Sequence, residues 1–403
     1  MVKKKKKTLK KNKIIKKVLI IGGGFAGCSC AEMLSKNKNL EVSLIEKSNH
    51  LGAGVRTFFY GGHPYTFGPR HFLTFNKEVY KYLNKHVPLR SCKEHEFLTY
   101  VENDNQFYNY PLHYSDIKKM PDRKKIYSEL KRRDMKKIKN AKNMEDFWIG
   151  SVGNILYKKM IEKYNKKMWL VDSNTKIDTF KWSPKGATIK SGPRAAWDKA
   201  ISCYPKKING YNDFFDKVER RKNIKFYFNA NLKISSLHKK IFKINNFKKK
   251  FDIVISTISP DFFFNNKFGE LPFIGRDFHK IVFPTQHVFP KNVYFLYYAN
   301  DEKFTRMVEY KKFTKHKSNT SLIGIEIPSL NGKHYPLPFK KEITKSHKYF
   351  KQMPNWFYSI GRAGTYRYEV DIDDCIEQAM QINLEIKKNE FLGSIPIKKW
   401  LSF

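Results

Sequence analysis

The sequence is poor in acidic residues, and this shortage sets its charge. Only 37 of its 403 residues are acidic, against 79 lysines and arginines, which gives a formal net charge of +42. Such a charge is typical of proteins that bind nucleic acid or an anionic membrane. The lysines are spread along the whole chain and no known nucleic-acid-binding motif is present. Compositional bias is therefore the simpler explanation, and we predict no nucleic-acid partner.

Cysteines are also few, and long apolar runs are missing. The five cysteines, at positions 28, 30, 92, 203 and 375, form no C-x-x-C pair. We therefore expect neither a disulfide framework nor a metal site, and we predict reduced thiols in a cytoplasmic protein. No apolar run approaches the roughly 18 residues that span a bilayer, so we predict no membrane span. The lysine-rich residues 1–16 predict a disordered basic arm.

What is present begins with the segment from Lys17 to Lys47, which predicts a strand, a glycine turn, a helix and a second strand. Gly22, Gly24 and Gly27 have the G-x-G-x-x-G spacing of a dinucleotide-binding turn. The first glycine permits the turn, the second lets backbone N–H groups approach a pyrophosphate, and the third brings helix and strand together. Glu46 ends the second strand, where a carboxylate accepts hydrogen bonds from ribose hydroxyls. FAD or NAD is therefore favoured over NADP.

The rest of the chain is long enough for further domains. With 403 residues and 41% hydrophobic content, it can bury a large core in two or three domains. Residues 61–74 are rich in glycine, proline and aromatic side chains, which is typical of an ordered loop that lines a ligand. Arg70 and His71 are the polar candidates in this loop.

Three segments in chain order resemble landmarks of the UDP-galactopyranose mutase family. They are EKSNHLG at 46–52, FGPRHFLT at 67–74 and NYPL at 109–112, and the resemblance continues to about Lys387. That family comprises flavoenzymes that interconvert the six-membered and five-membered ring forms of a nucleotide-linked galactose. The resemblance implies an α/β fold with a Rossmann-like FAD-binding domain, an inserted helical domain and an antiparallel sheet substrate domain.

The resemblance also implies domain boundaries. The FAD-binding domain would take residues 17–85, 225–265 and 350–390. Residues 86–170 would form a helical domain on the uridine side. Residues 171–224 and 266–349 would form a loop and the antiparallel sheet of the substrate domain. Within the FAD-binding part, Ile224–Asn229, Ile234–Asn246 and Phe251–Thr257 are predicted as strands.

The family comparison implies residues that contact FAD. The segment from Gly361 to Tyr368 would cross the flavin, and a helix that begins near Asp371 would direct its positive end toward the flavin ring. The full implied set is Gly22, Gly24, Phe25, Ala26, Gly27, Glu46, Lys47, His50, Leu51, Gly52, Arg70, His71, Thr257, Gly361, Arg362 and Tyr368.

The resemblance further implies the residues that hold the substrate. Arg306 matches the arginine that binds the pyrophosphate, where a guanidinium fork suits two phosphate oxygens. Tyr335 and Tyr368 match tyrosines on the phosphates. Tyr164 and Trp169 match aromatic positions beside uracil, where stacking is worth about 1–3 kcal/mol, although a simple core role is the alternative. The substrate set is completed by Trp197, and the catalytic set is Arg306, Tyr335, Tyr368 and Arg70.

Two positions depart from the family. The family's mobile loop carries an arginine that closes on the diphosphate, but here the aligned position is Trp182 or a neighbour, and the nearest cations are Lys185, Lys190 and Arg194. The lid is thus predicted to be built differently. Arg70 replaces the usual histidine, and its longer side chain is suited to an N-acetyl carbonyl. Contact of Arg70 with flavin or backbone is an equal alternative.

The implied reaction uses the N5 atom of reduced FAD as a covalent nucleophile on the sugar, so no catalytic serine, cysteine or lysine is required. The substrate would be UDP-galactopyranose or UDP-N-acetylgalactosamine, and the furanose product would serve cell-surface glycan synthesis. NAD(P)H or another reductant is the expected electron source, and a homodimer is allowed. The alternatives are an FAD-dependent oxidoreductase of the amine-oxidase type and a catalytically silent flavin-binding homologue.

Overall fold

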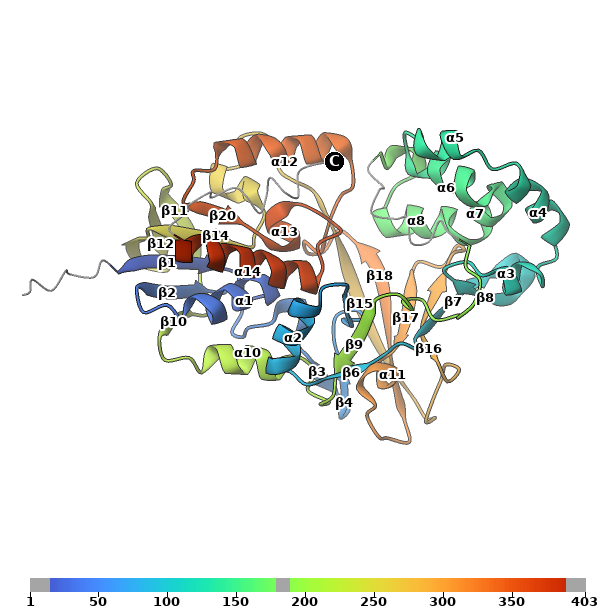
Figure 1. Cartoon of the computed structure of the whole chain (residues 1–403), viewed down its shortest axis with the longest axis horizontal. Coiled ribbons are helices and arrows are strands. Elements are labelled where there is room, and N and C mark those ends of the chain that lie inside the picture. Colours follow the sequence, from blue (N-terminus) through green and yellow to red (C-terminus); the bar gives the residue numbers. More distant parts are fainter. Residues whose placement is uncertain (1–14, 179–188, 389–403) are drawn as a thin grey trace, which may run out of the picture.

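The structure is a computed structural model that describes residues 15–178 and 189–388 (Figure 1). Most of the predicted basic arm lies outside the described residues, and Lys16 already belongs to the first strand. Among the described helices, none is long and apolar enough to cross a bilayer.

A parallel sheet of five strands forms the first layer. Its order is β10–β2–β1–β14–β20, and every neighbouring pair is parallel. Alternate residues of the central strand β1 point to opposite faces, and both faces are covered, so the strand is apolar from Val18 to Ile21. The strands are β1 (Lys16–Ile21), β2 (Leu40–Ile45), β10 (Ile224–Tyr227), β14 (Ile253–Ser256) and β20 (Phe357–Ser359).

The two faces of this sheet have different covers. On one face the core joins Val18 and Ile20 to side chains of α1 (Phe25–Leu34), α10 (Asn212–Glu219) and α14 (Ile372–Lys388). On the other face Leu19 and Ile21 join a core that includes α12 (Lys340–Gln352) and a three-stranded meander. The meander consists of β11 (Leu232–Ser236), β12 (Ile241–Ile244) and β13 (Phe247–Lys250). The predicted α/β fold class with a Rossmann-like domain is confirmed.

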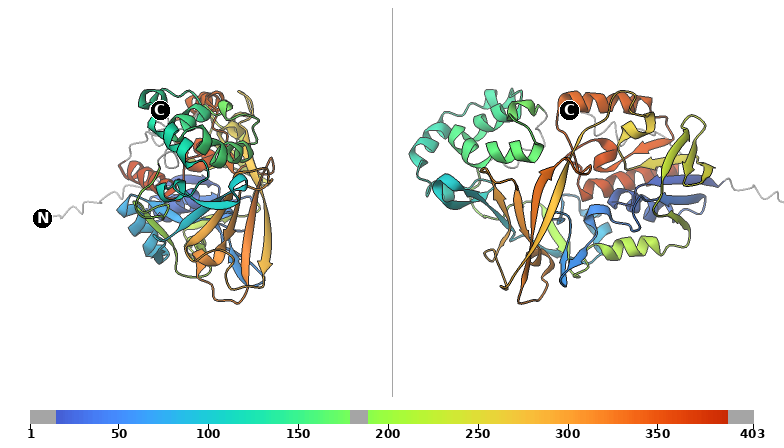
Figure 2. Two further views of the ribbon diagram at one scale, coloured as in Figure 1. Left: turned by 90° about the vertical axis from the view of Figure 1, so that its right-hand side faces the viewer. Right: turned by 180° about the vertical axis from the view of Figure 1, so that it is seen from behind.

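A larger sheet of seven strands forms the second layer. Its order is β19–β15–β18–β17–β16–β7–β8, and all neighbours are antiparallel except β16 and β7. Figure 2 shows these long strands below the helical part of the molecule. The strands are β7 (Glu96–Val101), β8 (Gln106–Tyr110), β15 (Phe273–Phe283), β16 (Val293–Tyr298), β17 (Arg306–Glu309), β18 (Ser321–Ser329) and β19 (Tyr335–Pro336).

Six of the described helices follow the sheet strand β8, and their hydrophobic core, which contains Trp148 and Trp169, also takes in side chains of the large sheet. Figure 1 shows them as a separate lobe at one end of the molecule. They are α3 (Tyr114–Ile117), α4 (Arg123–Lys131), α5 (Met135–Lys139), α6 (Met144–Val152), α7 (Asn154–Met160) and α8 (Glu162–Trp169).

Short elements connect the layers. One small sheet consists of β3 and β4. Another has three strands, with β9 between β5 and β6. These elements and the remaining helices are β3 (Phe58–Tyr60), β4 (His63–Tyr65), β5 (Phe72–Thr74), α2 (Lys77–His86), β6 (Leu89–Ser91), β9 (Ile201–Pro205), α11 (Tyr310–Thr314) and α13 (Gly361–Thr365).

Several predicted boundaries were wrong. The helical part begins at Tyr114 and not at residue 86, because β7 pairs with β16 and carries residues 96–110 into the large sheet. Helix α10 was placed with the substrate domain, yet it packs on α1. The segment Ile234–Asn246 is not one strand, since the chain turns after Ser236 and β11 and β12 pair antiparallel.

Candidate functional site

The glycine turn joins β1 to α1 in the geometry that its spacing predicts. Gly22 has φ +97°, and a Cβ atom there would lie 2.1 Å from the hydroxyl of Thr257. A Cβ atom at Gly27 would lie 1.9 Å from the carbonyl oxygen of Gly22. Both positions therefore require glycine for reasons internal to the fold.

Gly24 is different, because a Cβ atom there would meet only Ala53, at 3.8 Å. Gly24 also precedes α1, and no side chain caps the first turn of that helix. The first N–H groups of a helix have no intrahelical partner and favour a phosphate. An open backbone at an uncapped helix start fits the pyrophosphate of a dinucleotide.

The predicted acid lies beside this turn. Glu46 accepts hydrogen bonds from the backbone N–H of Gly23 at 2.6 Å and of Ser48 at 2.9 Å. The backbone N–H of Gly52 donates to the carbonyl oxygen of Gly23 at 2.8 Å, so the segment after β2 folds back on the turn. Leu51 is fully buried in this contact. His50 lies close by, whereas the side chain of Lys47 is exposed.

The segment from Gly361 to Arg362 comes to the same place from the far end of the chain. Gly361 has φ +73°, and a Cβ atom there would lie 3.3 Å from Ala26. Its N–H donates to Gln378 on α14 at 2.7 Å. The helix expected near Asp371 is α14, which begins at Ile372. The residues Gly22, Gly24, Phe25, Ala26, Gly27, Thr257 and Gly361 thus surround one helix start.

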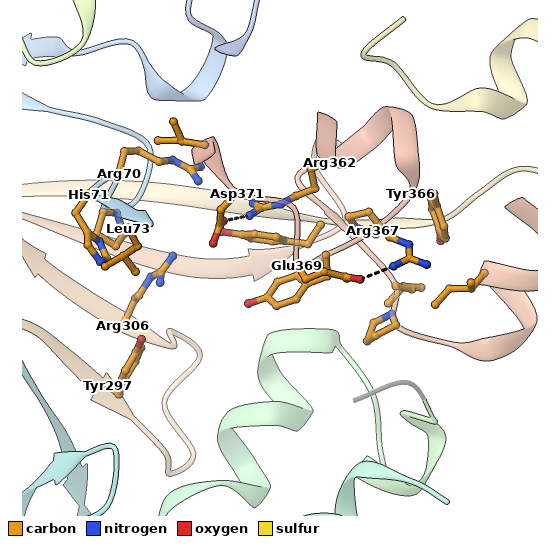
Figure 3. A pocket seen from close by; sticks show the side chains of 18 of the residues that line it. Arg70, His71, Leu73, Tyr297, Arg306, Arg362, Tyr366, Arg367, Glu369 and Asp371 are labelled. Carbon is orange, nitrogen blue, oxygen red and sulfur yellow. Dashed lines mark hydrogen bonds and ion pairs between the residues drawn. The ribbon is translucent and has the colours of Figure 1, made fainter. Parts of the chain in front are cut away.

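Next to this region lies a cavity of about 1070 Å³ between the two large sheets and the helical lobe. Figure 3 shows Arg70, Arg306 and Arg362 reaching it from three separate parts of the chain. The described lining also includes other predicted site residues, namely His71, Trp197, Tyr335 and Tyr368. A cavity of this size with several convergent cations suits an anionic ligand.

Arg306 is held by a buried carboxylate. Its Nε donates to Glu326 at 2.7 Å, and Glu326 is 2% exposed. Although burial disfavours the charge of the guanidinium, Glu326 raises the pKa of Arg306. Because Nε is used for this pair, the terminal nitrogens point away from Glu326, and the guanidinium also hydrogen-bonds the hydroxyl of Tyr297 at the cavity wall.

Tyr335 is surrounded by guanidinium groups. The Cζ atom of Arg276 lies 4.6 Å from the centre of its ring and that of Arg362 lies 5.1 Å away. Burial opposes ionisation of the phenol, but Arg70 and Arg306 outweigh burial and lower the pKa of Tyr335 to about 8. Tyr335 is thus a hydrogen-bond donor that loses its proton in a mildly alkaline solution.

We predict that the affinity for a diphosphate ligand, with UDP as the probe, falls as the pH rises above about 8. Ionised Tyr335 can no longer donate to a phosphate oxygen, and its negative charge repels the diphosphate. Kd should rise by at most about tenfold per pH unit, the limit for one proton. Tyr335→Phe should bind more weakly below pH 8 and lose this alkaline dependence. Calorimetric titration with UDP across this pH range measures both effects.

Tyr349→Phe is the matched control, because its hydroxyl donates to the carbonyl oxygen of Gly269 and Tyr349 is not among the residues that line the cavity. Its pH profile should equal that of the unchanged protein. An alkaline limb that persists in Tyr335→Phe would assign the titration to another group.

Arg362 and Tyr368 complete this wall of the cavity. Arg362 forms an ion pair with Asp371, and its Nε donates to the carbonyl oxygen of Val370 at 2.9 Å (Figure 3). Its Cζ atom also lies 5.7 Å from the ring of Tyr368. The ring centres of Tyr335 and Tyr368 are 5.4 Å apart. The predicted flavin-side and phosphate-side residues therefore meet at one place.

Comparison with known proteins gives this arrangement a family. The sequence profile of UDP-galactopyranose mutase matches residues 159–368, which is more than half of the chain. The chain belongs to the UDP-galactopyranose mutase family. A profile of NAD(P)-binding Rossmann-like domains matches residues 20–86. The family makes the chain a sugar-nucleotide mutase, an isomerase, with a flavin as cofactor.

Individual relatives agree with the mutase family. A dTDP-fucopyranose mutase of Escherichia coli is 25% identical over 406 residues, covering 93% of this chain and 99% of that one. The crystal structure of a reduced UDP-galactopyranose mutase superposes with a TM-score of 0.76 at 16% identity, covering 95% of this chain and 97% of that one. A redesigned putrescine oxidase gives a TM-score of 0.56 at 12% identity, covering 93% and 99% of the two chains, and shows the shared fold alone.

Within the mutase family, two predicted substrate residues have an unexpected setting. Neither Tyr164 nor Trp169 is among the residues that line the cavity. Tyr164 packs edge-on against Tyr297 at 5.1 Å, and Trp169 packs against Tyr368 at 4.9 Å. Both stand directly behind a lining tyrosine, so contact of either ring with uracil stays a proposal.

Two of the predicted lid cations form ion pairs away from the cavity, and the third lies outside the described residues. Trp182 and Lys185 lie outside the described residues. Arg194 makes a two-pronged pair with Asp116 at 2.8 and 3.0 Å, and Lys190 pairs with Asp198 at 3.0 Å. Neither Arg194 nor Lys190 lines the described cavity.

Sequence reasoning missed Arg276 and Glu326. Arg276 donates to the carbonyl oxygen of Met168 at the end of α8, at 3.4 Å, and its guanidinium covers Tyr335. It was one cation among 79 and carried no local signal. Glu326 had a signal, because it is the single charged residue in the largely apolar strand SLIGIEIPS. A carboxylate there is buried and needs a cationic partner.

Proposed function

We propose that this protein interconverts the pyranose and furanose forms of a nucleotide-linked galactose or N-acetylgalactosamine, with reduced FAD as its cofactor. The observation that carries the proposal is the cavity itself. Arginines and tyrosines from separate parts of the chain converge there beside the dinucleotide turn, and the described lining includes no serine or cysteine. Of the three described carboxylates in its lining, Glu369 and Asp371 are paired with arginines, and Asp178 accepts a hydrogen bond from the backbone N–H of Lys340. The lining also contains Lys340 and Thr344, and it is the family resemblance that favours a nucleophile supplied by the cofactor.

The proposed cofactor site combines the features around α1. The first turn of that helix would hold the pyrophosphate, and Glu46 would hold the ribose. Arg362 and the start of α14 would lie at the flavin. When bound and reduced, FAD would supply the nucleophile for the anomeric carbon.

The chain's own residues would stabilise the departing nucleotide. Negative charge grows on the diphosphate when its bond to the sugar breaks, and Arg306 would meet that charge with two N–H groups. Tyr335 and Tyr368 would donate hydrogen bonds without adding charge. Glu326 keeps Arg306 in place, so the cation does not have to move during the reaction.

The direct test is turnover. The purified protein is loaded with FAD and reduced with dithionite, and it then receives UDP-galactose, UDP-N-acetylgalactosamine or dTDP-fucose. The third substrate is included because a relative is a dTDP-fucopyranose mutase. Chromatography should detect a furanose product when the enzyme is reduced and none when it is oxidised. Stoichiometric oxygen consumption would instead indicate an amine-oxidase type of enzyme, and a flavin-bound but inactive protein would indicate a silent homologue.

Arg70 gives a test of the sugar preference. It lines the cavity, and its longer reach suits an N-acetyl carbonyl. We expect Arg70→His to lower kcat/KM for UDP-N-acetylgalactosamine by about tenfold relative to UDP-galactose, the value of one lost hydrogen bond. Competition between the two substrates measures this ratio directly. An unchanged ratio with full flavin content would remove Arg70 from sugar recognition.

The cellular setting also stays a proposal. The furanose product would supply cell-surface glycan synthesis from the cytoplasm. NAD(P)H or another reductant would keep the flavin reduced. Gel filtration with light scattering would test the homodimer that the family resemblance allows.

A further inference from the structure

The outer face of the β11–β13 meander carries a row of lysines. In the strand register Lys233 lies directly opposite Lys243, and Lys243 lies directly opposite Lys248. Residues that are directly opposite in a sheet point to the same face, with Cβ atoms about 5 Å apart. Lys250, opposite Ile241, extends the same face. We call Lys233, Lys243, Lys248 and Lys250 the lysine row.

The other face of the meander shows which side is free. Phe242 and Ile244 are fully buried in the core that joins the meander to the parallel sheet. Leu232 and Ile234 pack against the same core. The lysine row lies on the opposite face, where Lys233, Lys248 and Lys250 are exposed.

Within the part of the chain that the structure describes, the row has no ion-pair partner. None of its lysines makes an ion pair with a carboxylate of the described residues, although nearby Lys225 and Lys249 both pair with Glu41. Residues 222–251 contain nine lysines and no aspartate or glutamate. Like charges directly opposite one another in a sheet destabilise it. The row therefore lowers folding stability unless an anionic partner neutralises its charge.

Protection of sheet edges does not account for the whole row. Lysines protect edge strands from aggregation, which accounts for Lys233 on β11 and for Lys248 and Lys250 on β13 but not for the row as a whole. The central strand β12 has no free edge, yet it carries Lys243 in the middle of the row.

The kind of charge indicates the kind of partner. Residues 222–251 contain no arginine, the residue that recognises a single phosphate or carboxylate through a fork. The outer face also offers no exposed aromatic row on which bases would stack. Lysine point charges on a sheet face suit a diffuse layer of negative charge, as on an anionic lipid surface.

We propose that the lysine row docks this protein on an anionic phospholipid surface. Figures 1 and 2 place the meander at the end of the molecule opposite the helical lobe, so docking leaves the cavity between them open to solvent. The contact is peripheral and electrostatic, and it weakens as salt is added. It is independent of which sugar the cavity accepts.

The test compares two triple variants of the full chain with equal charge. Lys233→Gln, Lys243→Gln and Lys248→Gln remove the row. Lys85→Gln, Lys291→Gln and Lys317→Gln form the control, because these lysines are exposed, unpaired among described residues and outside the meander. Vesicles of phosphatidylcholine, with or without phosphatidylglycerol, are used for flotation.

The unchanged protein and the control should float with the anionic vesicles and not with the neutral ones. The row variant should bind about 10- to 100-fold more weakly, since each lysine near an anionic surface contributes several-fold. Its melting temperature should be equal or higher, because repulsion within the row is relieved. Equal loss in both variants would show that net charge alone causes binding and would overturn the proposal. Selective loss of RNA binding with unchanged flotation would also overturn it.

Discussion

Arg306→Lys should lower kcat of the reduced enzyme by about 10²- to 10³-fold, the effect of removing a fixed donor from a developing negative charge. Lysine keeps the positive charge opposite Glu326 but cannot present two N–H groups in one plane. The fold should tolerate the exchange, because the buried carboxylate stays paired. Chromatographic turnover assays at saturating substrate measure the change, and a melting curve checks the fold.

Arg367→Lys is the matched control for this exchange. Arg367 lines the same cavity, but it is paired with Glu369 at 3.1 Å on the far side from Arg306 (Figure 3). Its replacement should leave kcat near that of the unchanged protein. If both exchanges reduce kcat equally, the total charge of the cavity matters and the fork of Arg306 does not.

Glu326→Gln tests whether the position of the Arg306 guanidinium matters in addition to its positive charge. The guanidinium of Arg306 would lose the carboxylate that orients it at 2.7 Å. We therefore expect kcat to fall while KM changes little, because a loosely held cation must reorganise in the transition state.

The parts of the fold that local rules dictate were predictable. The apolar run of β1 and the glycines that follow it define the strand, turn and helix, because a side chain at Gly22 or Gly27 would clash with its neighbours. The strand at Ile253–Ser256 was found for the same reason, since a strand buried on both faces is apolar throughout. Arg70, Arg306, Tyr335 and Tyr368 were found by resemblance, and the structure gathers them in one cavity.

The missed features depend on distant pairing. Residues 96–110 were assigned to the helical domain, but β7 joins the large sheet through β16, nearly 200 residues later in the chain. Arg276 acquires its role only when the end of α8 comes to lie against β15. The turn between β11 and β12 was missed because the apolar residues on both sides of it kept the alternation of a single strand.

Gly27→Ala should destabilise the fold itself. The added methyl carbon would lie 1.9 Å from the carbonyl oxygen of Gly22, so helix α1 must move away from β1. Overpacking in a tight core costs about 1–3 kcal/mol, and a clash with backbone belongs at the upper end of that range. The free energy of unfolding of the flavin-free protein, measured by urea titration, should fall by that amount.

Gly24→Ala should weaken FAD binding without destabilising the fold. Its methyl group would meet only Ala53 at 3.8 Å, so the flavin-free protein should unfold at the same urea concentration as before. FAD affinity should nevertheless fall about tenfold or more, because the methyl group stands where backbone N–H groups approach the pyrophosphate. Fluorescence titration with FAD measures this. Equal stability loss in both variants, or full FAD affinity in Gly24→Ala, would contradict the assignment of Gly27 to packing and Gly24 to the cofactor.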